Sequence, residues 1–242
     1  AFDLRVVPMS VLLGMAVITI TGLIDDVVGL DPRLKIAGQL FAAAALAADQ
    51  IGVQVARGFI MPIADALGIP SVELMVGGQA IQTIGFAIDL PVTLPLIGEA
   101  LRFDLVYWSG AAIIAIFVLG GCNASNLIDG LDGLLSGVTA MAVAGILVVA
   151  LGLALVDDGP RDTQRIILAL AVLGACLGFL PHNFNPANIF LGDCGSLLLG
   201  YCTVVLILLL GDTGKTHLVV AGLVAGQPVE RRGRLELLGA RR

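Results

Sequence analysis

The chain has 242 residues, of which 58% are hydrophobic and only 13% are charged, and its formal net charge is −6. A soluble domain carries about 25% charged residues, so this chain could not cover its own surface with polar groups, and lipid is the solvent that accepts so much apolar surface. The negative net charge argues against nucleic acid as a partner.

Apolar segments of membrane-spanning length recur along the chain. A span needs about 20 mostly apolar residues because the hydrocarbon core of a bilayer is about 30 Å thick. The segments that qualify, or nearly do, are residues 6–24, 36–53, 105–121, 135–156, 166–182, 196–210 and 216–229. The sequence therefore predicts an all-α integral membrane protein, a multi-pass helical bundle with about seven transmembrane helices.

One long connector interrupts this series. Residues 54–104 are rich in proline and glycine, and their apolar runs are too short to span. The alternating run from Leu90 to Leu96 fits a hairpin or a re-entrant piece. We expect a single membrane domain over residues 1–229, and alternation of the spans puts 54–104 on the membrane face opposite to the polar connectors. Residues 230–242 form an arginine-rich tail that differs in character from the rest.

Polar residues gather in three other connectors. If the spans alternate in direction, connectors 25–35, 122–134 and 183–195 lie on one face of the membrane. Lysine and arginine occur on both sides, so the positive-inside rule does not orient the chain. We therefore expect the chemistry-bearing residues to share one face, and charge alone does not say which.

The first connector carries two adjacent carboxylates, Asp25 and Asp26, directly after an apolar span. A charge at the centre of a span costs about 2.5–3.5 kcal/mol on insertion scales, so such residues sit at helix ends or in polar cavities. Taken alone, this pair fits a solvated helix end as well as it fits a site.

The second connector repeats an oxygen-bearing side chain every third residue, at Asn123, Asn126, Asp129 and Asp132. On a helical or 3₁₀ turn this period places the four side chains along one side. Carboxylate and amide oxygens are hard ligands that suit magnesium. The regularity favours a functional loop over an ordinary helix cap.

The third connector ends in Asp193, flanked by Gly192 and Gly195 just before the next span. Ser196 is placed to cap that helix, whose positive N-terminal end would favour a phosphate. Five aspartates would then gather on one face with hardly a cation, and a divalent metal would supply the counter-charge. Metal with carboxylates is a recurring arrangement for activating a phosphate anhydride. The residues themselves thus predict metal-dependent phosphoryl chemistry at a membrane surface.

These three connectors also resemble the signature loops of a known family, the polyprenyl-phosphate N-acetylhexosamine-1-phosphate transferases. Asp25-Asp26 with Lys35 resembles the first acidic loop, and Asn123 to Leu134 resembles the loop NxxNxxDGLDGL. The run from Pro186-Ala187 to Ser196 resembles PAxxFxGDxGS. The same superfamily includes the phospho-N-acetylmuramoyl-pentapeptide transferase of peptidoglycan synthesis.

The resemblance implies a magnesium- or manganese-dependent enzyme of the inner (plasma) membrane with cytoplasmic active-site loops. It implies that Asp193 binds the metal with Asn126, and that Asp25, Asp26 and Asp193 are catalytic. Asp25 and Asp26 would handle the lipid phosphate, and which aspartate acts as a base, if any, stays open. The substrate-binding residues would be Lys35, Asn123, Asp129, Asp132, Asn183, Gly192 and Ser196, of which Asp129 and Asp132 would contact the nucleotide-sugar or shape the loop.

The expected reaction transfers a sugar-1-phosphate from a UDP-N-acetylhexosamine to polyprenyl (undecaprenyl) phosphate and releases UMP, an early membrane step of cell-envelope glycan synthesis such as that of lipopolysaccharide or teichoic acid. The short stretch between Asp26 and Lys35 resembles the simple-sugar branch, which makes UDP-N-acetylglucosamine the leading donor. The alternative is phospho-N-acetylmuramoyl-pentapeptide transfer. A homodimer is left open.

Two other classes compete with this reading. A multi-pass ion-coupled transporter also carries intramembrane carboxylates, although usually near the bilayer midplane. An inactive fragment is the other, because the family's first two spans, its early basic loop and its late histidine-rich loop have no counterpart in these 242 residues. We expect the chain to insert into membranes and to show little transferase activity by itself.

Overall fold

The computed structural model describes residues 7–53, 66–69, 72–76, 79–94, 98–156 and 160–211. Within these ranges lie six long helices and four strands. The helices are α1 (Met9–Val28), α2 (Pro32–Ala48), α4 (Leu105–Ile128), α5 (Leu134–Val156), α6 (Pro160–Asn183) and α7 (Gly192–Gly211). The strands are β1 (Val72–Val76), β2 (Gln79–Thr83), β3 (Gly85–Leu94) and β4 (Gly98–Asp104).

Five of the described helices are long and apolar enough to cross a membrane: α1, α4, α5, α6 and α7. Their outward faces carry large apolar side chains such as Ile116, Met141 and Leu155, exposed by 67%, 75% and 70%. Such a surface suits lipid and would be unstable in water. The expectation of a helical membrane bundle is thus confirmed, whereas the number seven is not.

Of the two remaining predicted spans, one is a shorter helix and the other lies outside the described residues. The segment predicted at 36–53 is a helix at 32–48, which at 17 residues is shorter than the other five. Its early start has a physical cause: Asp31 accepts a hydrogen bond from the Arg33 N–H, and Pro32 suits the first turn. The segment predicted at 216–229 and the tail 230–242 lie outside the described residues.

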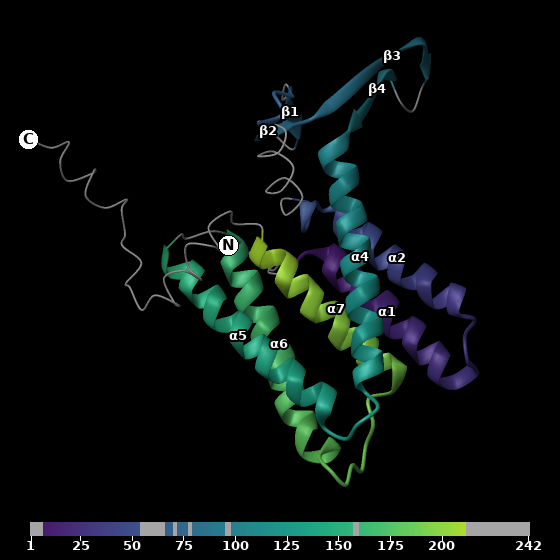
Figure 1. Ribbon diagram of the computed structural model, residues 1–242, viewed down its shortest axis with the longest axis vertical. Helices are drawn as coiled ribbons and strands as arrows, with labels where there is room; N and C mark the ends of the chain where they lie inside the picture. Colours follow the sequence, from purple (N-terminus) through teal and green to yellow (C-terminus); the bar gives the residue numbers. More distant parts are fainter. Residues whose placement is uncertain are drawn as a thin grey trace, which may run out of the picture.

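The long connector corrects the purely helical expectation, because it contains two antiparallel hairpins. Strand β1 pairs with β2, and β3 pairs with β4, with a register irregularity between Asp89 and Leu94. The alternating run near Leu90 therefore belongs to a hairpin rather than to a re-entrant piece. Figure 1 places both hairpins beyond the upper end of α4, and β4 leads directly into that helix.

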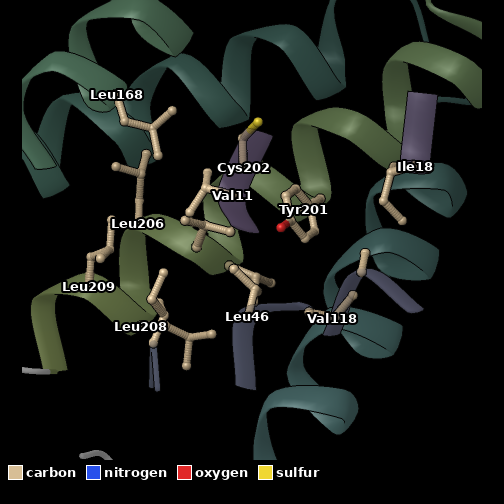
Figure 2. Close-up of a cluster of buried hydrophobic side chains, with 14 of the residues drawn as sticks. Val11, Ile18, Leu46, Val118, Leu168, Tyr201, Cys202, Leu206, Leu208 and Leu209 are labelled. Carbon is tan, nitrogen blue, oxygen red and sulfur yellow. The ribbon is translucent and has the colours of Figure 1, made fainter. Parts of the chain in front are cut away.

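Helix α7 is the centre of the bundle. It packs against α1 and α4, and more weakly against α5 and α6, and α2 packs against α1 and α4. In its most apolar stretch 56% of the residues are buried, against 28% in each of the other four spans. Figure 2 shows the resulting core, to which α7 contributes Tyr201, Cys202, Leu206, Leu208 and Leu209.

The contact between α7 and α4 requires a glycine. A Cβ atom at Gly200 would lie 2.5 Å from the Gly121 carbonyl oxygen and 2.8 Å from the Cys122 Cα. Both neighbours are backbone atoms, which cannot rotate away as a side chain could. The two helices are therefore as close as their backbones allow at this point, which is how helices in lipid gain packing energy.

This close contact predicts that Gly200→Ala will destabilise the protein by about 1–3 kcal/mol, because the added methyl group must push α4 and α7 apart. Thermal unfolding in detergent measures the loss. Gly178→Ala in α6 is the matched control, since a Cβ there meets no atom within 4 Å. Equal stability of the two variants would contradict the proposed packing.

Candidate functional site

The three polar connectors meet at one end of the bundle, the lower end in Figure 1, away from the hairpins. Hydrogen bonds join them directly: Asp26 in α1 bonds to the start of α7, and Asn126 in α4 bonds to Asp193. In addition, Asp132 after α4 bonds to Ala187 before α7. Residues more than 160 positions apart are thus brought within contact distance, as the predicted spans implied.

Asp25 and Asp26 point in different directions because adjacent helical residues are rotated by about 100°. Both lie in the last turn of α1, which ends at Val28, four residues beyond the predicted end of that span. The Asp25 carboxylate accepts a hydrogen bond from the Leu30 N–H at 2.7 Å. The Asp26 carboxylate accepts two, from the Asp193 N–H at 2.8 Å and from the Cys194 N–H at 3.0 Å.

Asp26 therefore caps α7 from another helix. The first N–H groups of a helix have no partner within it and carry the positive end of the helix dipole. The predicted cap, Ser196, has a different role: its hydroxyl is fully buried and lies 3.1 Å from the Asn126 amide nitrogen. Sequence alone could not reveal a cap that arrives from another helix.

Gly192 is required by this cap. Its φ of +63° lies in the left-handed region, which side chains disfavour, and a Cβ there would lie 2.8 Å from Asp26 Oδ2. The absence of a side chain lets the Asp26 carboxylate approach the helix end. Gly192, predicted to bind substrate, contacts this carboxylate in the structure.

Lys35 lies between two of the predicted carboxylates. Its Nζ atom is 2.5 Å from Asp25 Oδ2 and 2.7 Å from Asp193 Oδ2. The hydrogen bond to Asp193, followed by that to Asp25, raises the pKa of Lys35 above its ordinary value. The ammonium is therefore held charged, and one cation links α1, α2 and α7.

Asn126 completes this cluster from α4. Its amide nitrogen donates to Asp193 Oδ1 at 2.7 Å and to the Ser196 hydroxyl at 3.1 Å. The predicted metal pair, Asp193 and Asn126, thus lies together. In this arrangement Asn126 presents N–H, so its oxygen would reach a cation beside Asp193 only after the amide rotates by half a turn.

Asp129 is the one predicted aspartate whose carboxylate has no hydrogen bond among the described residues. Partial burial, followed by repulsion from Asp193 and Asp26, raises the pKa of Asp129 from 3.8 to about 6. Burial is thus the main cause of the shift, and the nearby carboxylates of Asp193 and Asp26 add to it.

Asp132 and Asn183 hold the connectors together. Asp132 Oδ2 accepts from the Asn185 amide at 3.1 Å and from the Ala187 N–H at 3.0 Å. The Asn183 side chain is buried; it accepts from the Gly133 N–H and the Ser136 hydroxyl and donates to the Ile189 carbonyl. Both were predicted to bind substrate, and the contacts in the structure are those of residues that shape the loop.

Asn123 lies one turn deeper in α4 than Asn126. Its amide nitrogen donates to the Leu119 carbonyl at 2.7 Å and to Gln39 Oε1 at 2.9 Å. Gln39, in α2, was not predicted as a functional residue. The sequence does contain a pattern that could have identified it. Gln39 is the only polar residue of α2 after Lys35, and the spacing of four residues places both on one face of the helix.

The cluster contains the types of ligand that a divalent cation takes. Two carboxylates, from Asp25 and Asp193, already converge on the Lys35 ammonium, and a third, from Asp129, lies near enough to Asp193 to be repelled by it. Carboxylate and amide oxygens are the ligands that magnesium takes in proteins. No group of three histidine, cysteine, aspartate or glutamate residues in the described ranges is arranged as a ready-made metal site.

A bundle of membrane-length helices with an acidic polar cluster at one end defines a polytopic membrane protein with a candidate active site. The model of glycosyl transferase family 4 matches residues 8–211, which include every described helix. The chain belongs to this family.

The curated relatives that the chain resembles share one name. The chain is 38% identical over 150 residues to the phospho-N-acetylmuramoyl-pentapeptide-transferase of Bacillus cytotoxicus, covering 60% of this chain and 43% of the relative. It is 37% identical over 147 residues to the enzyme of the same name from Bacillus licheniformis, covering 59% and 43%. The chain thus matches less than half the length of these relatives.

The raised pKa of Asp129 leads to a pH-dependent prediction. The folded state retains a proton that the unfolded state releases between pH of about 4 and 6, so this residue lowers stability as the pH rises through that window. Asp129→Asn cannot ionise, and its advantage in thermal stability over the unsubstituted chain should be small at pH 4 and reach a plateau above pH 7. Unfolding midpoints in detergent across this range provide the measurement. A difference that does not vary with pH would contradict the assignment.

Proposed function

We propose that this chain carries the active site of a membrane transferase that moves a sugar-1-phosphate from a UDP-sugar to polyprenyl phosphate and releases UMP. The observation that carries the proposal is the convergence of Asp25, Lys35, Asn126 and Asp193, from four different helices, at one end of the bundle. A membrane-embedded scaffold gives a lipid acceptor access to this cluster from the bilayer. Membership of the family supports the same reaction class.

In the proposed reaction an oxygen of the acceptor phosphate attacks the sugar-bearing phosphorus of the donor. One P–O bond forms, the bond to the UMP oxygen breaks, and UMP leaves with the electron pair. Catalysis of such transfers depends on positioning and on stabilising spread negative charge. Lys35 would supply the positive charge that stabilises this negative charge. Asp25 and Asp26 would position the acceptor phosphate.

A magnesium or manganese ion, when bound, would neutralise charge on the donor phosphates. Asp193 would hold it, with Asn126 after rotation of its amide, and Asp25 lies close enough to contribute. Asp129 lies near the same carboxylates, whereas Asp132 supports the connector through Asn185 and Ala187.

The proposal assigns the cluster to the cytoplasmic face of the plasma membrane and the hairpins to the opposite face. Residues 1–229 would then form one membrane domain. Homodimer formation remains a prediction, which the mass of the detergent-solubilised protein would test.

Asp193→Asn should lower UMP release at least about 100-fold, because the amide keeps the shape of the side chain but loses the charge that holds the cation and Lys35. The measurement is release of labelled UMP at increasing magnesium concentration. Asp49→Asn is the control, since Asp49 is exposed at the far end of α2. Near-normal turnover of Asp193→Asn at high magnesium would rule out Asp193 as the principal ligand.

Two donors remain to be distinguished. The names of the relatives favour UDP-N-acetylmuramoyl-pentapeptide. The connector between α1 and α2 has only three residues, 29–31, which favours the simple-sugar branch and UDP-N-acetylglucosamine. We propose the pentapeptide donor, because identity across 150 residues outweighs the length of one connector.

With polyprenyl phosphate and magnesium present, kcat/KM for UMP release should therefore be higher with the pentapeptide donor than with UDP-N-acetylglucosamine. The assay is run on the chain itself and on the chain fused to the flanking segments of the Bacillus licheniformis relative. The opposite order of donors would assign the chain to the simple-sugar branch. Failure of the fused protein with both donors would refute the transferase proposal.

A further inference from the structure

Gln39 is an unusual residue for its place in the bundle. It lies in α2 with 0% of its side chain exposed, on the same buried face as Ala42, Ala43 and Leu46. Burying an amide costs free energy unless both of its polar atoms find partners. Packing alone would favour an apolar side chain of similar size, so the amide needs another explanation.

The orientation of the Gln39 amide follows from its neighbour. Asn123 must present its NH₂ group to the Leu119 carbonyl, which can only accept. The second N–H of the same group then points at Gln39, which must present its oxygen, 2.9 Å away. Gln39 Nε2 is left buried and without a partner in the described part of the chain.

This amide pair lies directly beneath the charged cluster. Gln39 follows Lys35 by four residues in α2, and Asn123 precedes Asn126 by three in α4, so each pair shares one face of its helix. The bond between Gln39 and Asn123 thus links α2 to α4 one turn below the residues that contact Asp193.

The remaining contacts of α2 do little to fix its position along α4. Three of its five buried residues are alanines, whose methyl groups offer little resistance to axial sliding. The hydrogen bond from exposed Asn123 to buried Gln39, by contrast, forms in only one register, and polar pairs within a helix contact are the best-attested means of specifying register. A slide of one residue along the axis would move Lys35 by about 1.5 Å.

We propose that Gln39 is a positioning residue whose hydrogen bond to Asn123 fixes the register of α2 against α4 and so holds Lys35 between Asp25 and Asp193. The positioning of Lys35 stands on geometry alone. Only its consequence for turnover rests on the proposed transferase function.

The test measures Lys35 directly. The sequence has one other lysine, Lys215, which serves as an internal reference. In Gln39→Met, an apolar side chain of similar length replaces the amide, and Lys35 should be acylated at least about threefold faster relative to Lys215 than in the unsubstituted chain. Peptide mass spectrometry gives the ratio. Thermal stability should stay equal or rise, because an unpaired buried donor has been removed.

Two further variants make the outcome decisive. Ser10→Ala is the matched control. It removes a different buried polar group without a partner among the described residues, the Ser10 hydroxyl, at the end of α1 away from Asp25, and it should leave Lys35 acylation unchanged. Asn123→Leu removes the partner and should raise acylation as Gln39→Met does, with no further gain in the double variant. It also serves as the test if Gln39→Met does not fold.

Unchanged Lys35 acylation in folded Gln39→Met or folded Asn123→Leu would overturn the proposal, and so would a gain accompanied by an equal gain in Ser10→Ala. In the active protein, Gln39→Met should lower kcat about tenfold and change the donor KM little. A loss of activity with no change at Lys35 would likewise count against it. Inactivity of the protein fused to the flanking segments of the Bacillus licheniformis relative would refute the transferase function and leave the acylation result intact.

Discussion

The site depends on a single cation shared by carboxylates that would otherwise repel one another. Lys35 contacts Asp25 and Asp193, which come from opposite ends of the sequence. Since α1 packs against the central helix α7 whereas α2 packs against α1 and α4, this one ammonium links three helices at their polar end. The arrangement of the other site residues follows from it, because Asn126 and Asp26 both bond to the segment around Asp193.

The sequence predicted the membrane class, six of the helices and the meeting of the three connectors, because hydrophobic length and alternation are local properties. It placed the end of α1 too early, at residue 24, because Asp25 and Asp26 read as a polar boundary. Both carboxylates find partners through the fold and so remain in the helix. The pairing of β1 with β2 and of β3 with β4 was only partly visible, since proline and glycine obscured the alternation.

The distribution of roles within the site was less predictable. The three-residue spacing predicted the same role for Asp129 and Asp132. In the structure the Asp129 carboxylate has no hydrogen bond among the described residues, whereas Asp132 supports the α6–α7 connector. Asn183 and Ser196 are expected to bind substrate because of the family resemblance, and in the structure both are buried and bonded within the protein. These differences arise from contacts between segments far apart in sequence, which no local pattern records.

The capping of α7 by Asp26 has a consequence for anion selectivity. The N–H groups at the start of this helix are already occupied by a carboxylate that belongs to the same molecule and has a high effective concentration at its target. A small free anion, such as inorganic phosphate, must compete with it and gains no other contact in return. In the proposed transferase, an anion that is also bound through a sugar or a lipid would compete better. The first N–H groups of α7 are thus closed to any anion that does not displace Asp26.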